Sequence, residues 1–228
     1  IAPATGEAGF RWAKSALPVA ERLSEKHGAA YHRGLFLLAQ GHVAYLNGEW
    51  RAALEWLRHA EKLLRASERR DVQWALLSCN TVQTIAAVLS GDLAGVGQRM
   101  PSVLEEARKR SDLHGIALLS YPRVIWELAC DRPDEARKLS DEAACCKGAP
   151  AEHLRDFTSL HGALLVDRYI GDAQGAYARI ERSWPALERG KLLVVNIVRV
   201  SALAERGSAA LSSITPNMSA SEREQRLR

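Results

Sequence analysis

The chain has 228 residues and a formal charge of +4, and its 47% hydrophobic and 25% charged residues are ordinary for a folded domain. These values exclude a chain that is disordered throughout. The longest apolar runs are far shorter than the roughly 20 residues that cross a bilayer, so we expect no membrane span and a cytoplasmic protein. The sequence begins Ile1-Ala2-Pro3, without methionine or an apolar leader, which leads us to expect a piece of a longer protein.

The positive charge comes from 24 arginines and seven lysines. Basic residues alternate with acidic ones, as in the stretch 105–110 (EEARKR). Such mixing is typical of solvated helix faces, whereas nucleic-acid binding needs cations gathered on one face. We therefore expect no direct binding of nucleic acid.

Cysteine and histidine spacing gives no sign of a metal site. Cys79, Cys130, Cys145 and Cys146 form no C-x-x-C pair, and no histidine lies at a zinc-binding spacing. We expect reduced thiols, no metal and no cofactor. The adjacent pair Cys145–Cys146 is expected to pack at a helix end, because neighbouring thiols strain a mutual disulfide.

Apolar residues follow helical spacing along almost the whole chain, and no stretch alternates with period two, which predicts an all-α protein. Short connections make neighbouring helices antiparallel. In chain order the predicted helices are 7–26, 30–46, 49–66, 70–90, 92–109, 113–130, 133–146, 152–170, 172–188 and 190–206.

Prolines and the C-terminal composition modify this pattern. Pro101, Pro122 and Pro185 fall inside helical stretches, so we expect kinks or breaks there. Pro133 suits a first helical turn, and Asp131 is a candidate cap just before it. The segment from about Ser212 lacks an apolar face and is predicted to be disordered.

A turn recurs about every forty residues, which is typical of stacked helical hairpins that cannot bury their apolar faces alone. We predict a right-handed superhelical stack of about five antiparallel hairpins. Residues 1–29 would be the entry helix of a preceding repeat, 30–211 the repeat domain and 212–228 the tail. The turn centres, spaced by 43, 40 and 40 residues, are Gly48, Gly91, Asp131 and Gly171.

In the first full unit, residues 34–67, Gly41 takes the small position at the helix crossing, Gly48 makes the turn, Trp50 is the aromatic residue after it, and Ala53 is the small residue opposite Gly41. This unit resembles a tetratricopeptide repeat (TPR). Small residues let the two backbones approach closely. Later units keep the turn and a residue of limited size five positions on, namely Val96, Ala136 and Ala176.

A narrower resemblance lies in the stretches 179–189 (RIERSWPALER) and 192–200, together with 48–55 (GEWRAALE). These resemble the repeat region that follows the kinase and AAA-type ATPase modules of large bacterial serine/threonine-protein kinases, common in myxobacteria. The resemblance covers about residues 10–206 and departs from the family after Val200, where the sequence becomes rich in Ser and Ala. It implies an interaction or sensor region in signal transduction, covalently linked to kinase and ATPase modules.

The chain itself carries no phosphate-binding loop, Walker lysine, H-R-D or D-F-G motif. We therefore expect no catalytic residue and no enzymatic activity in these 228 residues. Two alternatives stay open: an inducer-sensing tail of a large ATP-dependent transcription regulator, and a free-standing TPR adaptor.

The inner groove of such a stack is lined by its first helices, and we expect a protein or peptide partner to bind there. The alternative is that the tyrosines pack between repeats and the histidines are ordinary surface residues. All tryptophans other than Trp50 are expected to be core wedges. The candidate groove residues are His42, Tyr45, Tyr121, His161, Arg168 and Tyr169.

Overall fold

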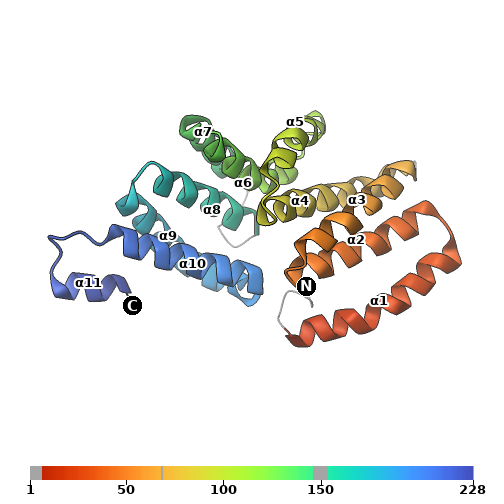
Figure 1. The fold of residues 1–228 in the computed structure, drawn as a ribbon, viewed down its shortest axis with the longest axis horizontal. Coiled ribbons are helices and arrows are strands. Elements are labelled where there is room, and N and C mark those ends of the chain that lie inside the picture. Colours follow the sequence, from red (N-terminus) through yellow and green to blue (C-terminus); the bar gives the residue numbers. More distant parts are fainter. Residues whose placement is uncertain (1–6, 68, 146–153, 228) are drawn as a thin grey trace. The chain divides into compact units, whose positions relative to one another are not determined.

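The computed structural model describes residues 7–67, 69–145 and 154–227, and every regular element in these ranges is helical (Figure 1). This confirms the all-α prediction. Consecutive helices pack as sequential antiparallel pairs, consistent with a stack of helical hairpins. The elements are α1 (Glu7–His27), α2 (Ala30–Leu46), α3 (Trp50–Ala66), η2 (Arg70–Val72), α4 (Gln73–Leu89), α5 (Leu93–Lys109), α6 (Leu113–Ala129), α7 (Pro133–Cys145), α8 (Leu154–Tyr169), α9 (Ala173–Arg189), η3 (Leu192–Val194), α10 (Asn196–Ser213) and α11 (Ala220–Leu227).

The helices form two compact units, unit 1 (Ile1–Gly115) and unit 2 (Ile116–Arg228). The sequence analysis treated residues 30–211 as one repeat domain. Each unit has a hydrophobic core of its own, as a stack of hairpins allows.

Proline does not break the helices. Pro101, Pro122 and Pro185 lie inside α5, α6 and α9, each of which continues past its proline. The helices are therefore not broken there, and the kink that the sequence analysis gave as the other outcome stays a prediction. A proline removes one hydrogen bond of the i to i−4 ladder, and packing of the surrounding turns holds the rest in place.

The four recurrent turns share one backbone geometry. Gly48, Gly91 and Gly171 have φ of 82–83°, and Asp131 adopts the same left-handed region with φ of 57°. In each turn the central N–H donates to the carbonyl three residues back, and the next N–H to the carbonyl five residues back, at 2.8–3.2 Å. This Schellman pattern satisfies carbonyls that a helix end leaves unpaired. Asp131 is therefore the turn residue itself and not the helix cap.

Two of these turns continue into a capped helix. The Asp92 carboxylate accepts a hydrogen bond from the Gly95 N–H at 2.9 Å, and Asp172 accepts one from Gly175 at 2.8 Å. A Cβ at Gly95 would lie 2.3 Å from an Asp92 oxygen, and a Cβ at Gly175 would lie 2.0 Å from an Asp172 oxygen. The sequence pattern G-D-x-x-G therefore encodes both the end of one helix and the start of the next.

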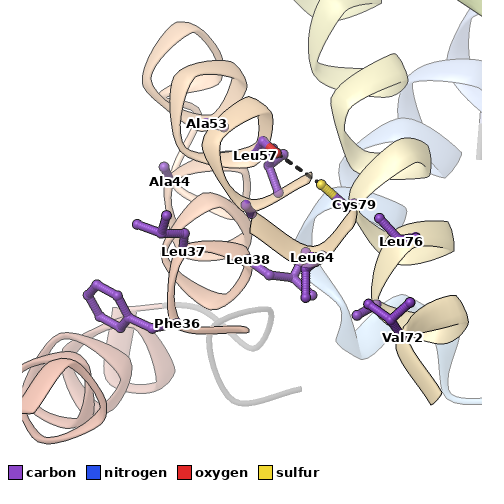
Figure 2. Close-up of a cluster of buried hydrophobic side chains, with 12 residues drawn as sticks. Phe36, Leu37, Leu38, Ala44, Ala53, Leu57, Leu64, Val72, Leu76 and Cys79 are labelled. Carbon is purple, nitrogen blue, oxygen red and sulfur yellow. Dashed lines mark hydrogen bonds between the residues drawn. The ribbon is translucent and has the colours of Figure 1, made fainter. Parts of the chain in front are cut away.

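The core of unit 1 lies between α2, α3 and α4 (Figure 2). Leu57 and Leu64 of α3 are fully buried, and each points at a glycine of α2. A Cβ at Gly41 would lie 2.5 Å from Leu57 Cγ, and one at Gly34 would lie 2.9 Å from Leu64 Cγ. Ala53 is also fully buried, with its carbonyl oxygen 3.5 Å from the same Gly41 position. Because Gly34 and Gly41 have no side chains, α3 can pack close to α2.

Unit 2 has an equivalent core in which small second-helix residues are again buried. Ala136 of α7 and Ala176 of α9 have no exposed surface. Ala136 packs with Val124 of α6 and Val166 of α8. Ala176 packs with Leu164 of α8, and α10 covers the far side of this cluster.

The C-terminal segment is helical where disorder was predicted. α10 continues to Ser213, and α11 covers Ala220–Leu227. Ser219 and Glu222 form a reciprocal capping box: the Glu222 N–H donates to Ser219 Oγ at 3.2 Å, and the Ser219 N–H donates to the Glu222 carboxylate at 2.8 Å. The Arg226 guanidinium lies 4.3 Å from the Tyr177 ring of α9, which holds α11 against unit 2. The analysis of apolar faces overlooked this S-x-x-E signal.

None of the helices in the described ranges is long and apolar enough to span a membrane.

Candidate functional site

In unit 1 the groove prediction rests on the face that α2 shares with α4. His42 Nδ1–H donates to the Leu38 carbonyl at 2.8 Å, and its Nε2 lies 3.0 Å from Ser78 Oγ on α4. These two partners fit a neutral imidazole whose Nε2 accepts from the serine hydroxyl. Burial lowers the pKa of His42, although the bond to Leu38 acts in the opposite direction. His42 therefore joins two first helices and does not present a free polar tip.

Aromatic side chains lie on the same face. Tyr45 is half-buried and packs against the unit 1 core, as does Tyr31. Trp74 of α4 is one turn before Ser78 and is 72% exposed. The expectation that this tryptophan is a core wedge is wrong, and so is the same expectation for Trp12, which is 62% exposed. We call Tyr31, His42, Tyr45, Trp74 and Ser78 the aromatic face of unit 1.

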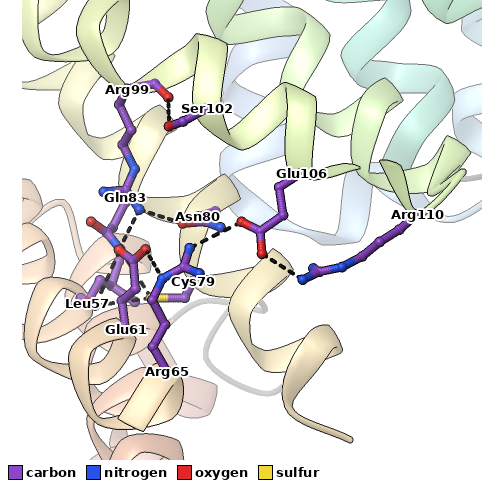
Figure 3. A network of polar contacts seen from close by, with 10 residues as sticks. All are labelled: Leu57, Glu61, Arg65, Cys79, Asn80, Gln83, Arg99, Ser102, Glu106 and Arg110. Carbon is purple, nitrogen blue, oxygen red and sulfur yellow. Dashed lines mark hydrogen bonds and ion pairs between the residues drawn. The ribbon is translucent and has the colours of Figure 1, made fainter. Parts of the chain in front are cut away.

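A polar network connects α3, α4 and α5 (Figure 3). The Glu61 carboxylate accepts from Arg65 at 2.9 Å, from Gln83 at 3.1 Å and from Arg99 at 2.5 Å. Burial acts to raise the pKa of Glu61, but these donors outweigh it and hold the pKa below its usual value. Arg99 also donates to Asn80, so one guanidinium ties three consecutive helices together.

Cys79 lies beneath this network and is not a reactive thiol. Its Sγ donates to the Leu57 carbonyl at 3.1 Å and accepts from Gln83 at 3.2 Å. Burial raises the pKa of Cys79 to about 11, which leaves it protonated at neutral pH. Cys130 is exposed, and Cys146 lies outside the described residues.

A small open cavity of about 260 Å³ adjoins the network, lined by Arg58, Gln83, Asp92 and Arg99 among others. Small-molecule sites usually measure roughly 300–1,000 Å³ and are mostly apolar. This cavity is smaller and carries charges of both signs. A second open cavity of about 540 Å³ lies beside the first turn, lined by Glu49, Trp50, Arg51 and Leu89 among others, and its volume falls within the range of small-molecule sites.

In unit 2 three of the predicted groove residues meet at a buried carboxylate. The Glu205 side chain on α10 is 11% exposed, and it accepts from Arg168 at 2.8 Å and lies 3.2 Å from His161 Nε2. The Tyr121 ring stacks on the His161 ring with centroids 4.4 Å apart. We call Tyr121, His161, Arg168 and Glu205 the Glu205 cluster.

Burial controls the ionisation of this cluster. Burial and the nearby Glu205 charge raise the pKa of Tyr121 to about 12. Burial also acts to raise the pKa of Glu205, but the bonds from His161 and Arg168 outweigh it and lower that pKa. Glu205 is thus held ionised between two donors. The cluster therefore links α8 to α10 inside unit 2.

Tyr169 occupies a different position, at the end of α8. Its side chain is 47% exposed, and its hydroxyl donates to the Asp131 carboxylate at 2.7 Å. This bond links two consecutive hairpin turns. It also raises the pKa of the Tyr169 hydroxyl.

The predicted groove residues therefore divide into two sets. His42 and Tyr45 belong to unit 1, and the other four belong to unit 2. A groove that binds a peptide through these residues needs accessible polar atoms, but His42, His161, Arg168 and Tyr169 all bond within the protein. Leaving a partly buried polar atom unpaired is costly, so these side chains pair with other residues of the fold. The positions of residues within the forty-residue repeat could not predict which residues those are.

Besides Glu205, two more buried carboxylates were not predicted from the sequence. Asp167 is 1% exposed and pairs with Arg137 and with Arg179, whose Nε lies 2.7 Å away. Glu127 is 3% exposed and pairs with Arg132 at 2.9 Å. Both acids stand four residues before a turn centre, where the first two hairpins carry alanine. When the four turns are aligned, both acids fall at this one position, so the alignment could have indicated them.

In the described part of the chain, no three side chains among the His, Cys, Asp and Glu residues gather closely enough to hold a metal ion. Glu61 and Glu205, two of the carboxylates whose pKa is lowered, are each held by an arginine. Comparisons of the chain with family models, curated proteins and solved structures give no match.

Proposed function

We propose that this chain is a non-catalytic protein-interaction region built from TPR-like helical hairpins, and that it binds an extended peptide on the aromatic face of unit 1. The observation that carries the proposal is Trp74, which is 72% exposed on a first helix. An exposed tryptophan leaves a large apolar surface in water, and such residues are the commonest hot spots of protein interfaces.

The surroundings of Trp74 favour a peptide over a folded protein surface. Tyr31 and Tyr45 on α2 lie on the same side of their helix as His42, whose bond to Ser78 holds α2 and α4 together on this face. Aromatic rings give wide contact at small entropy cost, because each has only two side-chain torsions. Nearby, the Arg69 guanidinium lies 4.4 Å from the Tyr31 ring and donates to both carboxylate oxygens of Asp71, at 2.8 and 2.6 Å.

The test is selection of peptides from a displayed random library on the 228-residue protein, followed by titration calorimetry. We expect Trp74→Ala to weaken the selected peptides about tenfold or more, since truncating an interface tryptophan typically costs 2 kcal/mol or more. The melting temperature should hardly change, because Trp74 is exposed. Trp12→Ala is the matched control, because it removes another largely exposed tryptophan, from α1, and it should leave peptide binding intact.

The proposal fails if no peptide is enriched, or if the enriched peptides bind Trp74→Ala as tightly as the unchanged protein.

We further propose that this region belongs to a larger cytoplasmic bacterial serine/threonine-protein kinase. The stretches 48–55, 179–189 and 192–200 carry that resemblance. The coding region upstream of Ile1 tests it directly. Kinase motifs followed by a Walker loop would support the proposal, a Walker loop alone would favour a transcription regulator, and an adjacent start codon would favour a free-standing adaptor.

A further inference from the structure

The buried Asp167 carboxylate of unit 2 marks a position in the hairpin pattern. Asp167 stands four residues before the turn centre Gly171, and Arg179 stands eight residues after it. The Arg179 Nε donates to Asp167 at 2.7 Å, and Arg137 of α7 donates to the same carboxylate. A carboxylate on a first helix is thus bound by arginines from the second helices before and after it.

Unit 1 repeats this arrangement without the acid. In the hairpin whose turn centre is Gly91, the residue four positions before the centre is Ala87, and the residue eight positions after it is Arg99. Arg137 stands six residues after the preceding turn centre, and the residue at that position in unit 1 is Leu54. This hairpin therefore keeps one arginine and lacks the carboxylate that the arginine would bind.

A cavity lies where the longer side chains are missing. Leu54, Ala87 and Arg99 all line the open cavity of about 260 Å³ between α3, α4 and α5. Alanine is shorter than aspartate and leucine is shorter than arginine, so the two exchanges leave space here. The volume equals the share of roughly nine water molecules in the liquid, which suits a small organic acid.

The retained arginine has a donor without an acceptor. Arg99 uses one terminal nitrogen for Glu61 and Asn80, and its buried Nε donates to no residue in the described ranges (Figure 3). In Arg179 the same atom donates to Asp167. A buried donor without an acceptor costs free energy, so a carboxylate oxygen placed beside it would be bound favourably.

A second arginine adds positive charge at the cavity. Arg58 of α3 lines it, is exposed, and forms no hydrogen bond or ion pair with any residue that the structure describes. Guanidinium groups bind carboxylates through short, charge-assisted hydrogen bonds. Asp92 also lines the cavity, so a ligand with two acidic groups is disfavoured, whereas a hydroxyl group could donate to this aspartate.

We propose that this cavity binds a small free monocarboxylate that carries a hydroxyl group, and that the ligand carboxylate takes the place that the Asp167 side chain has in unit 2. The site is separate from the aromatic face of unit 1. At 100° per residue, positions 83, 84 and 87 lie about half a turn around α4 from Trp74 and Ser78. A ligand here contacts three consecutive helices, so its binding stabilises unit 1.

The experiment follows the backbone amide signals of the full chain by nuclear magnetic resonance while sodium lactate is added, with sodium chloride at equal ionic strength as the reference. We expect saturable shifts confined to α3, α4 and α5. Arg58→Gln should weaken lactate binding about tenfold or more, because it removes the unpaired cation. Arg108→Gln is the matched control, since it removes an exposed arginine from the far end of α5, and it should bind lactate like the unchanged protein.

Ala87→Asp tests the equivalence with unit 2 directly. The new carboxylate should pair with Arg99 as Asp167 pairs with Arg179, so this variant should melt no lower than the unchanged protein and should no longer bind lactate. A strongly lowered melting temperature would overturn the proposal, because the position would then have no space for a carboxylate.

The titrations give three further outcomes that would overturn it. The first is an unchanged protein that shows no saturable shifts, and the second is an equal response to chloride. The third is lactate binding that persists at full strength in Arg58→Gln or in Ala87→Asp.

Discussion

The closest contact between α2 and α3 depends on a missing side chain. A methyl group at Gly41 would lie 2.5 and 2.7 Å from two Leu57 carbons, well inside contact distance. We expect Gly41→Ala to lower the free energy of unfolding by about 1–3 kcal/mol, the usual cost of overpacking a core. Chemical denaturation followed by circular dichroism measures this.

Gly162→Ala is the matched control on another first helix. The added carbon would lie 3.6 Å from the nearest Val124 atom, an ordinary contact. Alanine is also the better helix former by about 1 kcal/mol, so this variant should be neutral or slightly more stable. Equal losses at the two glycines would contradict the packing described for unit 1.

The burial of His42 should make the free energy of unfolding depend on pH. Burial lowers its pKa in the folded protein below the value of about 6.5 expected for an unfolded chain. The unfolded state then binds the proton more readily, so this contribution is complete above about pH 6.5 and is lost as the pH falls through the folded pKa. The loss of unfolding free energy between pH 7 and pH 5 should be smaller in His42→Gln than in the unchanged protein.

Titration of the imidazole by nuclear magnetic resonance gives an independent check. The signal that disappears in His42→Gln should titrate with a midpoint below 6.5. A midpoint at or above that value would show that the ring is not desolvated as the structure has it.

At the scale of helices, a single buried acid holds three elements together. Asp167 of α8 is 1% exposed and pairs with Arg137 of α7 and Arg179 of α9. Removing one partner of a buried pair costs roughly 3–5 kcal/mol, and here we expect about 2–3 kcal/mol from Asp167→Ala because both arginines reach solvent. Glu105→Ala, which removes an exposed partner of Lys109, should leave the free energy of unfolding almost unchanged, because water screens this pair.

Denaturation of the two variants side by side checks this difference. Equal and small effects would mean that the Asp167 pairs contribute specificity without stability.

Helix positions were predictable because apolar spacing is a local property. The predicted range 49–66 became Trp50–Ala66, and 172–188 became Ala173–Arg189. The missed helix, α11, is held by a cap and by the stacking of Arg226 on Tyr177, neither of which appears as an apolar stripe.

The candidate site was less accessible to prediction. The helical spacing of the sequence placed His161 and Arg168 on one helix. Their partner Glu205 lies 44 residues after His161 and 37 residues after Arg168. Nothing in the local pattern assigns that partner. Trp74 shows the opposite error, because a tryptophan at helical spacing is usually buried, and only its exposure in the folded protein distinguishes a surface residue from a core residue.

At the scale of the whole molecule, two cores imply two regions of local stability. Leu57 lies in the core of unit 1, and its replacement by alanine should cost about 2–5 kcal/mol there. We expect amide hydrogen exchange in Leu57→Ala to accelerate mainly in α2 to α4, with α8 to α10 much less affected. Leu164→Ala is the mirror control and should produce the reverse pattern.

Acceleration of equal size throughout the chain in both variants would show that the two cores unfold as one cooperative unit.

The absence of phosphate-handling motifs gives a prediction for the full chain. Because the sequence has no glycine-rich loop with its lysine, we expect no site that binds and polarises a nucleotide phosphate. Incubation with ATP and magnesium should therefore release no ADP above a protein-free blank in a coupled assay. A saturable rate that follows the protein peak through two chromatographic steps would refute this.

The four identical turns have a consequence for how such a chain can change length. Each turn passes through one left-handed residue with the same pair of backbone hydrogen bonds. A segment cut out from one turn centre to the next, such as 132–171, therefore joins two ends that already have matching conformations. Gene duplication or deletion in steps of about forty codons would therefore meet no strained junction, because the left-handed residue keeps its place after a helix end. The shared turn thus gives this protein a way to lengthen or shorten by whole hairpins and still fold.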